Sequence, residues 1–253
     1  MNQFLSVDNI QIVYQTPQEE TVAVNDVSFV AEKGSFVSLV GPSGCGKSSL
    51  LGCIAAISKP QRGTITLQGR DIADSQQSIG YMLQSDNLLP WRSVWKNVII
   101  GLEIQNKVTA ENTAYAADLL KKYDLWQFRD SFPNRLSGGM RQRVALIRTL
   151  VLKPQLLLLD EAFSALDYQT RVNVSCDVWQ ILRRENKTMV MVTHDIPEAV
   201  AMSDKVVVLS PRPAVVAKTV EIDFGAERPD PVQVRQNPLF QQYFNTIWKE
   251  LTQ

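Results

Sequence analysis

The feature that most constrains the fold is a glycine-rich loop that follows a short apolar segment and precedes a helix-forming one. Residues 36–40 (FVSLV) lead directly into GPSGCGKS at 41–48. Small and apolar residues then continue to Ile57, which favours a helix. A buried strand, a glycine loop and a helix in this order are the context of a phosphate-binding loop, and a chance match in a glycine turn would lack it. The order predicts an α/β nucleotide-binding domain.

Each residue of this loop has an expected task. The backbone N–H groups would surround an anion, assisted by the positive end of the following helix. Lys47 would reach the β- and γ-phosphates, and the Ser48 hydroxyl would bind Mg²⁺. The other nucleotide contacts are expected from Gly41, Pro42, Ser43, Gly44, Cys45, Gly46 and Ser49.

The amino-acid composition indicates the cellular compartment and the kinds of partner that such a domain would have. The 253 residues hold 26 Lys plus Arg and 26 Asp plus Glu, and this balance argues against a surface that coats nucleic acid. Three cysteines without metal-ligand spacing are typical of a reduced, cytosolic compartment. We expect no secretory signal and no segment of the ~20 apolar residues that would cross a bilayer. Any role at a membrane would therefore need docking on another protein.

The chain divides into one nucleotide-binding core, one helical insertion and a tail. Alternating apolar residues at 4–12 and 24–30, and apolar runs at 64–67, 79–83, 156–159, 188–192 and 205–209, predict strands. Helical periodicity begins near Trp91, as at Ala114, Ala117, Leu120 and Lys121 after a Thr109 cap. We expect a single domain with a core at about 1–86 and 156–210 and a helical subdomain at about 87–155. Prolines after Ser210 predict a looser tail at about 211–253, helical at its end.

Acids and the single histidine follow two of the predicted strands. Asp160 and Glu161 come directly after residues 156–159, at the strand end that faces the phosphate site in open α/β sheets. Asp160 is the expected Mg²⁺ partner, through water, and Glu161 the expected general base. Two solvated acids would be the ordinary alternative without Lys47 and Ser48. His194 follows residues 188–193, and a lone histidine is more often structural.

A second anion site is suggested at residues 137–139. Ser137, Gly138 and Gly139 precede an arginine-rich helix, so a hydroxyl and free backbone amides meet a helix N-terminus. A capped helix start explains these residues about as well. The residues alone leave both interpretations open.

Three segments together resemble one family. The loop at 41–48, LSGGMRQR at 136–143 and the pair Asp160-Glu161 resemble the ATPase subunit of ATP-binding cassette (ABC) transporters. The resemblance implies a P-loop α/β core with an inserted helical subdomain and an N-terminal antiparallel β region. It also implies a homodimer or paired cassette around two ATP molecules, in which residues 136–139 complete the partner's site.

The resemblance assigns further roles. His194 would be the switch histidine at the γ-phosphate, and Gln84 would sense Mg²⁺ and the attacking water. Tyr14 would stack on adenine, although simple core packing is an alternative. Residues 164–167 (SALD) would be the D-loop, which crosses the dimer interface.

The branch of the family is suggested by residues 87–91, 193–199 and 210–213, which resemble the nitrate, sulfonate and taurine importers. Ala162, Ser164, Ile147 and Thr149 depart from that group's pattern without removing a catalytic group. The resemblance implies an ATPase at the cytoplasmic face of the inner membrane, peripheral, with separate transmembrane permease subunits and a periplasmic or lipid-anchored solute-binding protein. Leu88, Leu89, Trp91 and Trp95 would contact the permease or pack in the helical core.

Three rival functions are less consistent with the sequence. A non-transport ABC ATPase acting on DNA or ribosomes usually carries a coiled-coil insertion or two cassettes, and this chain has neither. A module that uses ATP only as a clamp would be expected to lack Glu161 or His194. A small-molecule kinase would leave residues 136–143 unexplained.

Overall fold

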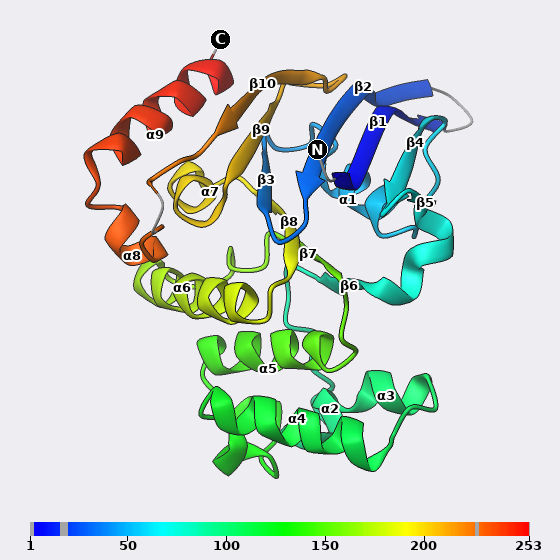
Figure 1. Ribbon diagram of the computed structural model, residues 1–253, viewed down its shortest axis with the longest axis vertical. Coiled ribbons are helices and arrows are strands. Elements are labelled where there is room, and N and C mark those ends of the chain that lie inside the picture. Colours follow the sequence, from blue (N-terminus) through cyan, green and yellow to red (C-terminus); the bar gives the residue numbers. More distant parts are fainter. Residues whose placement is uncertain (1–2, 16–19, 226–227, 253) are drawn as a thin grey trace.

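Two β-sheets, helices that lie beside them and a further group of helices, α2 to α5, make up the molecule (Figure 1). The computed structural model describes residues 3–15, 20–225 and 228–252. The six-stranded sheet has the order β10-β9-β3-β8-β7-β6, and the four-stranded sheet has the order β2-β1-β4-β5. This mixed α/β arrangement agrees with the fold class predicted from the sequence.

The six-stranded sheet supplies the edge on which the candidate site lies. Its strands are β3 (Phe36–Val40), β6 (Ile79–Met82), β7 (Leu156–Asp160), β8 (Thr188–Thr193), β9 (Lys205–Leu209) and β10 (Val216–Glu221). All neighbours are parallel except β10, which runs antiparallel to β9. Apolar runs such as Leu156 to Leu159 suit strands buried on both faces. Parallel pairing brings the carboxyl ends of β3, β6, β7 and β8 to one edge.

The N-terminal sheet is antiparallel, as expected. It contains β1 (Gln3–Gln15), β2 (Glu20–Glu32), β4 (Arg62–Leu67) and β5 (Arg70–Asp71). Helix α1 (Lys47–Ile54) begins directly after the glycine loop, and its buried leucines pack into the same core as both sheets. A 3₁₀ helix, η1 (Ile72–Ser78), then leads into β6.

Helices fill the segment between β6 and β7, below the sheet in Figure 1. They are α2 (Val94–Val98), α3 (Ile100–Ile104), α4 (Ala110–Lys122) and α5 (Gly138–Leu150), with short 3₁₀ turns at Trp126–Phe128 and Pro133–Arg135. Thr109 caps α4, as predicted, by accepting a hydrogen bond from the Asn112 N–H. Helix α4 lies where the periodicity predicted a helix. Of the residues that mark the periodicity, Leu120 is buried, together with Ala116 and Leu119, whereas Ala114 and Lys121 are exposed.

The segment after Ser210 is more regular than the looser tail predicted from its prolines. Strand β10, which the sequence analysis did not predict, pairs with β9 along the sheet edge. Helix α9 (Pro238–Leu251) confirms the predicted helical end, and its Ile247 is fully buried against α7 (Ile196–Met202) and the sheet. Burial of this helix outweighs the local effect of the prolines. The remaining helices are α6 (Tyr168–Arg184) and α8 (Pro231–Val234).

No helix within the described residues has the length and apolar character needed to span a membrane.

Candidate nucleotide site

The glycine loop forms a tight cradle at the carboxyl end of β3. Gly46 has φ +114°, and a Cβ there would lie 2.7 Å from Val24 Cγ2. A Cβ on Gly41 would lie 3.0 Å from the Leu209 carbonyl oxygen. Only glycine accepts these positions without movement of the backbone around it. The loop therefore has the close-fitting backbone that phosphate binding needs.

Lys47 lies within this cradle. Its side chain is buried, and its Nζ donates hydrogen bonds of 2.8 Å to the carbonyl oxygens of Gly41 and Pro42. Cys45, also buried, has its Sγ 3.9 Å from the same Nζ. The predicted loop residues thus surround one ammonium group, which can exchange these carbonyl contacts for phosphate oxygens.

Ser48, Asp160 and Tyr81 form a hydrogen-bonded group beside the cradle. The Ser48 hydroxyl donates to Asp160 Oδ1 at 2.9 Å, and the Tyr81 hydroxyl donates to Oδ2 at 3.0 Å. Burial, with the charge of Asp160, raises the pKa of Tyr81 well above its ordinary value, so the phenol stays protonated. The sequence analysis missed Tyr81, because it reaches Asp160 only through the pairing of β6 with β7, which joins distant parts of the chain.

Oxygen donors of this kind suit a magnesium ion. Mg²⁺ is usually held by one or two protein oxygens, several waters and the phosphates of a substrate. The described residues contain no group of three or more His, Cys, Asp or Glu side chains that could form an all-protein metal cage. The Ser48 and Asp160 oxygens therefore fit a substrate-bound Mg²⁺.

Glu161 and His194 face each other from the ends of neighbouring strands. Glu161 Oε2 lies 3.2 Å from His194 Nδ1, and the two side chains are partly open to solvent. Glu161 has φ +46°, a left-handed conformation that is uncommon for a residue with a Cβ. Its N–H donates to the Val192 carbonyl oxygen at 2.9 Å, which holds that conformation in place.

Gln84 joins the same group through Ser164. Its Nε2 donates to Ser164 Oγ at 3.2 Å, and that hydroxyl donates to the Glu161 carbonyl oxygen at 2.9 Å. A side chain that sequence analysis placed after β6 therefore connects to the end of β7. The structure thus links Gln84 to the Glu161 backbone through Ser164 and brings the Glu161 side chain against His194.

Tyr14 reaches the phosphate loop from β1. Its hydroxyl donates to Ser49 Oγ at 2.6 Å, and 51% of the residue is exposed. Core packing, the alternative interpretation of this aromatic residue, does not fit that exposure. The ring offers a flat surface beside the loop on which a base can stack.

A cavity of about 220 Å³ lies at the phosphate loop and Glu161. Arg212, which the sequence analysis did not treat as a site residue, is part of its wall and donates two hydrogen bonds to the Gly44 carbonyl oxygen. Its only sequence signal was its place in residues 210–213. The cavity is lined by Ser43, Gly44, Gly46, Lys47, Ser48, Ser49, Glu161 and Arg212.

The predicted second anion site does not meet this cavity within one chain. Ser137 is the exposed N-cap of α5, and its Oγ accepts a hydrogen bond of 3.3 Å from the Met140 N–H. A Cβ on Gly139 would lie 2.8 Å from Val174 Cγ2, so the first turn packs closely on α6. None of the residues Ser137, Gly138 and Gly139 lines the cavity at the phosphate loop.

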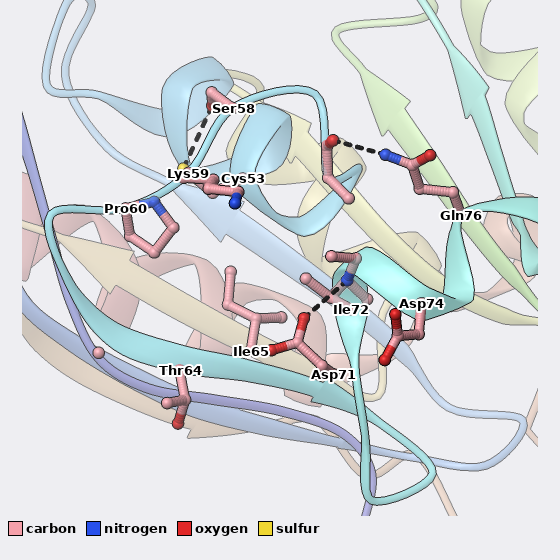
Figure 2. Close-up of a pocket in the computed structure, with 13 residues that line it drawn as sticks. Cys53, Ser58, Lys59, Pro60, Thr64, Ile65, Asp71, Ile72, Asp74 and Gln76 are labelled. Carbon is pink, nitrogen blue, oxygen red and sulfur yellow. Dashed lines mark hydrogen bonds between the residues drawn. The ribbon is translucent and has the colours of Figure 1, made fainter.

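A larger cavity of about 510 Å³ lies at the other end of α1 (Figure 2). Three of its polar side chains have partners within the protein: Cys53 Sγ with Ser58 Oγ, Asp71 with the Ala73 N–H, and Gln76 with the Ala56 carbonyl. Size alone does not identify the site, because the acids and cations arranged for phosphate chemistry are at the smaller cavity.

Comparison with known proteins agrees with this geometry. The family model described as ABC transporter matches residues 24–164. Among curated relatives, an uncharacterized ABC transporter ATP-binding protein, YtlC of Bacillus subtilis, is 46% identical over 98% of this chain and 95% of its own. The taurine import ATP-binding protein TauB of Rhizobium johnstonii is 39% identical over 93% of this chain and 92% of its own. Proteins named for nitrate, taurine and aliphatic sulfonate import match at 37% to 39% identity.

A solved structure extends the agreement to three dimensions. The ATP-binding cassette MJ0796, in a dimeric post-hydrolysis state bound to ADP and Pi, superimposes with a TM-score of 0.72 at 28% identity. The match covers 87% of this chain and all of that one. The glycine cradle, the paired acids and these relatives lead to one conclusion: the chain belongs to the ABC transporter family, as an ATP-binding cassette that hydrolyses ATP.

Proposed function

We propose that this cassette powers a bacterial importer for nitrate, sulfonate, taurine or a chemically similar solute, through separate transmembrane subunits. The observation that carries the proposal is the pairing of Glu161 with His194 beside the phosphate loop. A module that only clamps ATP does not need a carboxylate at this place. The import ATP-binding relatives support the direction of transport.

The phosphate loop and Tyr14 bind and orient ATP in this proposal. Tyr14 stacks on the adenine, and the loop amides and Lys47 hold the phosphates. Ser48 and Asp160 would hold an Mg²⁺ ion, which would neutralise negative charge on the phosphates. The Tyr81 hydroxyl fixes the orientation of the Asp160 carboxylate by its hydrogen bond.

Glu161 is the general base for hydrolysis. Its carboxylate accepts a proton from a water whose oxygen attacks the γ-phosphorus, and the bond from that phosphorus to the β,γ-bridging oxygen breaks to release ADP. His194, 3.2 Å from Glu161 Oε2, orients that carboxylate and can donate to a γ-phosphate oxygen. Gln84 is linked to the Glu161 backbone by hydrogen bonds through Ser164.

A second subunit completes the site. Ser137, Gly138 and Gly139 offer a hydroxyl and a helix N-terminus that do not line the cavity of their own chain. Two chains arranged head to tail would place this segment over the partner's γ-phosphate. ATP binding then closes the dimer and product release opens it, which is a two-state switch driven by the phosphate.

The surface after Gln84 is the proposed contact for the permease. Of the four residues expected there, Trp91 is exposed, Leu89 is half-buried, Leu88 is buried and Trp95 packs against the helical core. The expected permease contact therefore consists of the exposed Trp91 and the half-buried Leu89, with the other two residues as support. Docking there would hold the cassette at the cytoplasmic face of the inner membrane, with a solute-binding protein on the other side.

A tagged pull-down from detergent-solubilised membranes of the native host tests this function. We expect a polytopic membrane protein and a solute-binding protein to be recovered, and ligand screening on the latter would identify the solute. Recovery of the chain with ribosomal or DNA-bound partners, without a membrane protein, would contradict the transport role. ATP hydrolysis by the isolated chain would remain in that case.

A further inference from the structure

Arg212 contacts the phosphate loop from a distant part of the sequence. It lies in the turn between β9 and β10, 168 residues from Gly44. Its Nη2 and Nε donate hydrogen bonds of 2.6 Å and 3.2 Å to the Gly44 carbonyl oxygen. Gly44 has φ +76°, and its neighbours in the loop are the predicted phosphate ligands.

The turn that carries Arg212 is firmly held. Ala214 is completely buried and forms two backbone hydrogen bonds to β2, from its own N–H to the Ala23 carbonyl oxygen and from the Asn25 N–H to its carbonyl oxygen. Ser210 and Val215 close the turn through a backbone hydrogen bond of 3.0 Å. The base of the side chain is therefore fixed relative to the loop, so a contact there costs little ordering of the backbone.

The charge of Arg212 has no acidic partner among residues 3–15, 20–225 and 228–252. A guanidinium has five N–H donors, and the Gly44 carbonyl engages only the Nε–H and one Nη2–H. The remaining donors belong to a group that lines the cavity with Lys47, Ser48 and Glu161. Arginine recognises phosphate well because its planar fork can donate two parallel hydrogen bonds.

We propose that Arg212 is a positioning residue for the phosphate loop and a second cation for the nucleotide's phosphates. Its hydrogen bonds hold the Gly44 carbonyl outward, which keeps the loop N–H groups turned toward the anion. Its charge adds to that of Lys47 from another side of the cavity. This inference rests on the proposed nucleotide site and adds a residue from outside the segment that the ABC transporter family model matches, residues 24–164.

We expect loss of Arg212 to weaken nucleotide binding more than it lowers the rate of turnover. The phosphates are charged before and during hydrolysis, so Arg212 would stabilise the ground state and the transition state similarly. Loss of such uniform binding raises KM and leaves kcat nearly unchanged. For one charge-assisted contact at a partly exposed site, we expect about tenfold weaker binding.

The experiment compares Arg212→Gln and Arg212→Lys with the wild-type chain. Equilibrium binding of ATP and ADP is measured by displacement of a fluorescent ATP analogue at low and high salt, alongside KM and kcat. Arg212→Gln should weaken binding about tenfold and reduce its salt dependence, whereas Arg212→Lys should recover part of the affinity. Arg70→Gln is the matched control, because Arg70 is exposed on β5 and does not line the cavity.

The Lys47→Ala variant distinguishes a failure of the Arg212 inference from a failure of the proposed nucleotide site. If Lys47→Ala abolishes binding and Arg212→Gln binds like the wild type, the role of Arg212 is overturned and the nucleotide site stands. If Lys47→Ala also binds normally, the proposed site itself is wrong. Equal loss of affinity in Arg212→Gln and Arg212→Lys, with a lowered melting temperature without nucleotide, would overturn the inference in favour of a purely structural turn.

Discussion

At the residue scale, Glu161 of the active centre has its backbone held in an uncommon conformation. Glu161 keeps a positive φ because its N–H and carbonyl are both hydrogen bonded, the latter to the Ser164 N–H and hydroxyl. Such a conformation costs about 1–3 kcal/mol and persists only where the surroundings determine it. The fold therefore stabilises a strained residue where the proposed chemistry needs a carboxylate.

Replacing that carboxylate tests its proposed role. Glu161→Gln keeps the shape of the side chain and removes its basicity, so steady-state phosphate release should fall by at least about 100-fold. ATP binding should be retained, because the phosphate loop is unchanged. Phosphate release and ATP affinity are measured on the same preparation. Normal hydrolysis by the variant would contradict the assignment of Glu161 as the base.

Glu198 predicts a dependence of stability on pH. It is buried on α7, and its Oε2 accepts a 2.6 Å hydrogen bond from the Thr193 hydroxyl, one residue before His194. Burial raises the pKa of Glu198 to about 7, Asp195 adds to the rise, and Arg171 and Arg235 oppose it. The native state therefore holds a proton that the unfolded chain releases near pH 4.5.

The direction in which stability changes with pH follows from the higher pKa of Glu198 in the folded state. Between about pH 4.5 and 7 the native state binds more protons, so the contribution of Glu198 falls as pH rises and is fully lost above about pH 7. The full difference corresponds to about 3 kcal/mol. Glu198→Gln mimics the protonated acid and should lose less stability than the wild type between pH 5 and 8 in urea unfolding. Parallel pH profiles for the two proteins would exclude this explanation.

At the element scale, α5 connects the two parts of the proposed dimer site. Its N-cap is Ser137, and further along it Arg148 donates to the carbonyl oxygens of Asp86 and Asn87 at 2.8 Å and 2.7 Å. Burial lowers the pKa of Arg148 while its hydrogen bonds join α5 to the segment after Gln84. The helix that begins at Ser137 is thus hydrogen bonded to the segment that follows Gln84.

Two glycines make a matched test of packing around these elements. A Cβ on Gly80 of β6 would lie 2.5 Å from Thr149 Cγ2 of α5, so Gly80→Ala should destabilise the protein by about 1–3 kcal/mol. Gly52 lies inside α1 and its added Cβ would meet only Ser58 Oγ at 3.6 Å. Gly52→Ala should therefore stabilise by about 0.5–1 kcal/mol. If the urea midpoints of both variants shift in the same direction from the wild-type value, this account is contradicted.

At the scale of the whole molecule, we propose that a second chain completes the site. The Ser137 segment belongs to the helical part of the structure, and the cavity at the phosphate loop is lined without it. The dimeric state of the related cassette MJ0796 is consistent with completion by a second copy. The dimer is therefore the unit in which we expect hydrolysis.

Sedimentation measurements test that expectation. Glu161→Gln should form a dimer when ATP is added, because the site binds ATP without consuming it. The double variant with Ser137→Arg should stay monomeric, since an arginine would fill the proposed phosphate contact. Ser137→Arg also removes an N-cap at a cost of about 1 kcal/mol, so its melting temperature must show that it is folded. A dimer formed equally by both variants would contradict the shared site.

The sequence by itself predicted the features whose causes are local. The strand, glycine loop and helix at residues 36–57 follow from adjacent residues, as do the Thr109 cap and the helix at the chain's end. Glu161 and His194 were each predicted to follow a strand at its carboxyl end, because each comes directly after an apolar run. Sequence alone also placed the chain in its family, through short motifs that need no long-range contact to be recognised.

Only the tertiary structure decided which distant segments complete those local features. Tyr81 joins Asp160 because β6 pairs with β7, and Arg212 reaches Gly44 because β2 anchors its turn. Strand β10 and the buried face of α4 depend on neighbours that lie far away in the chain. Burial and pairing between remote residues outweigh local preference, so no window of sequence could have shown them.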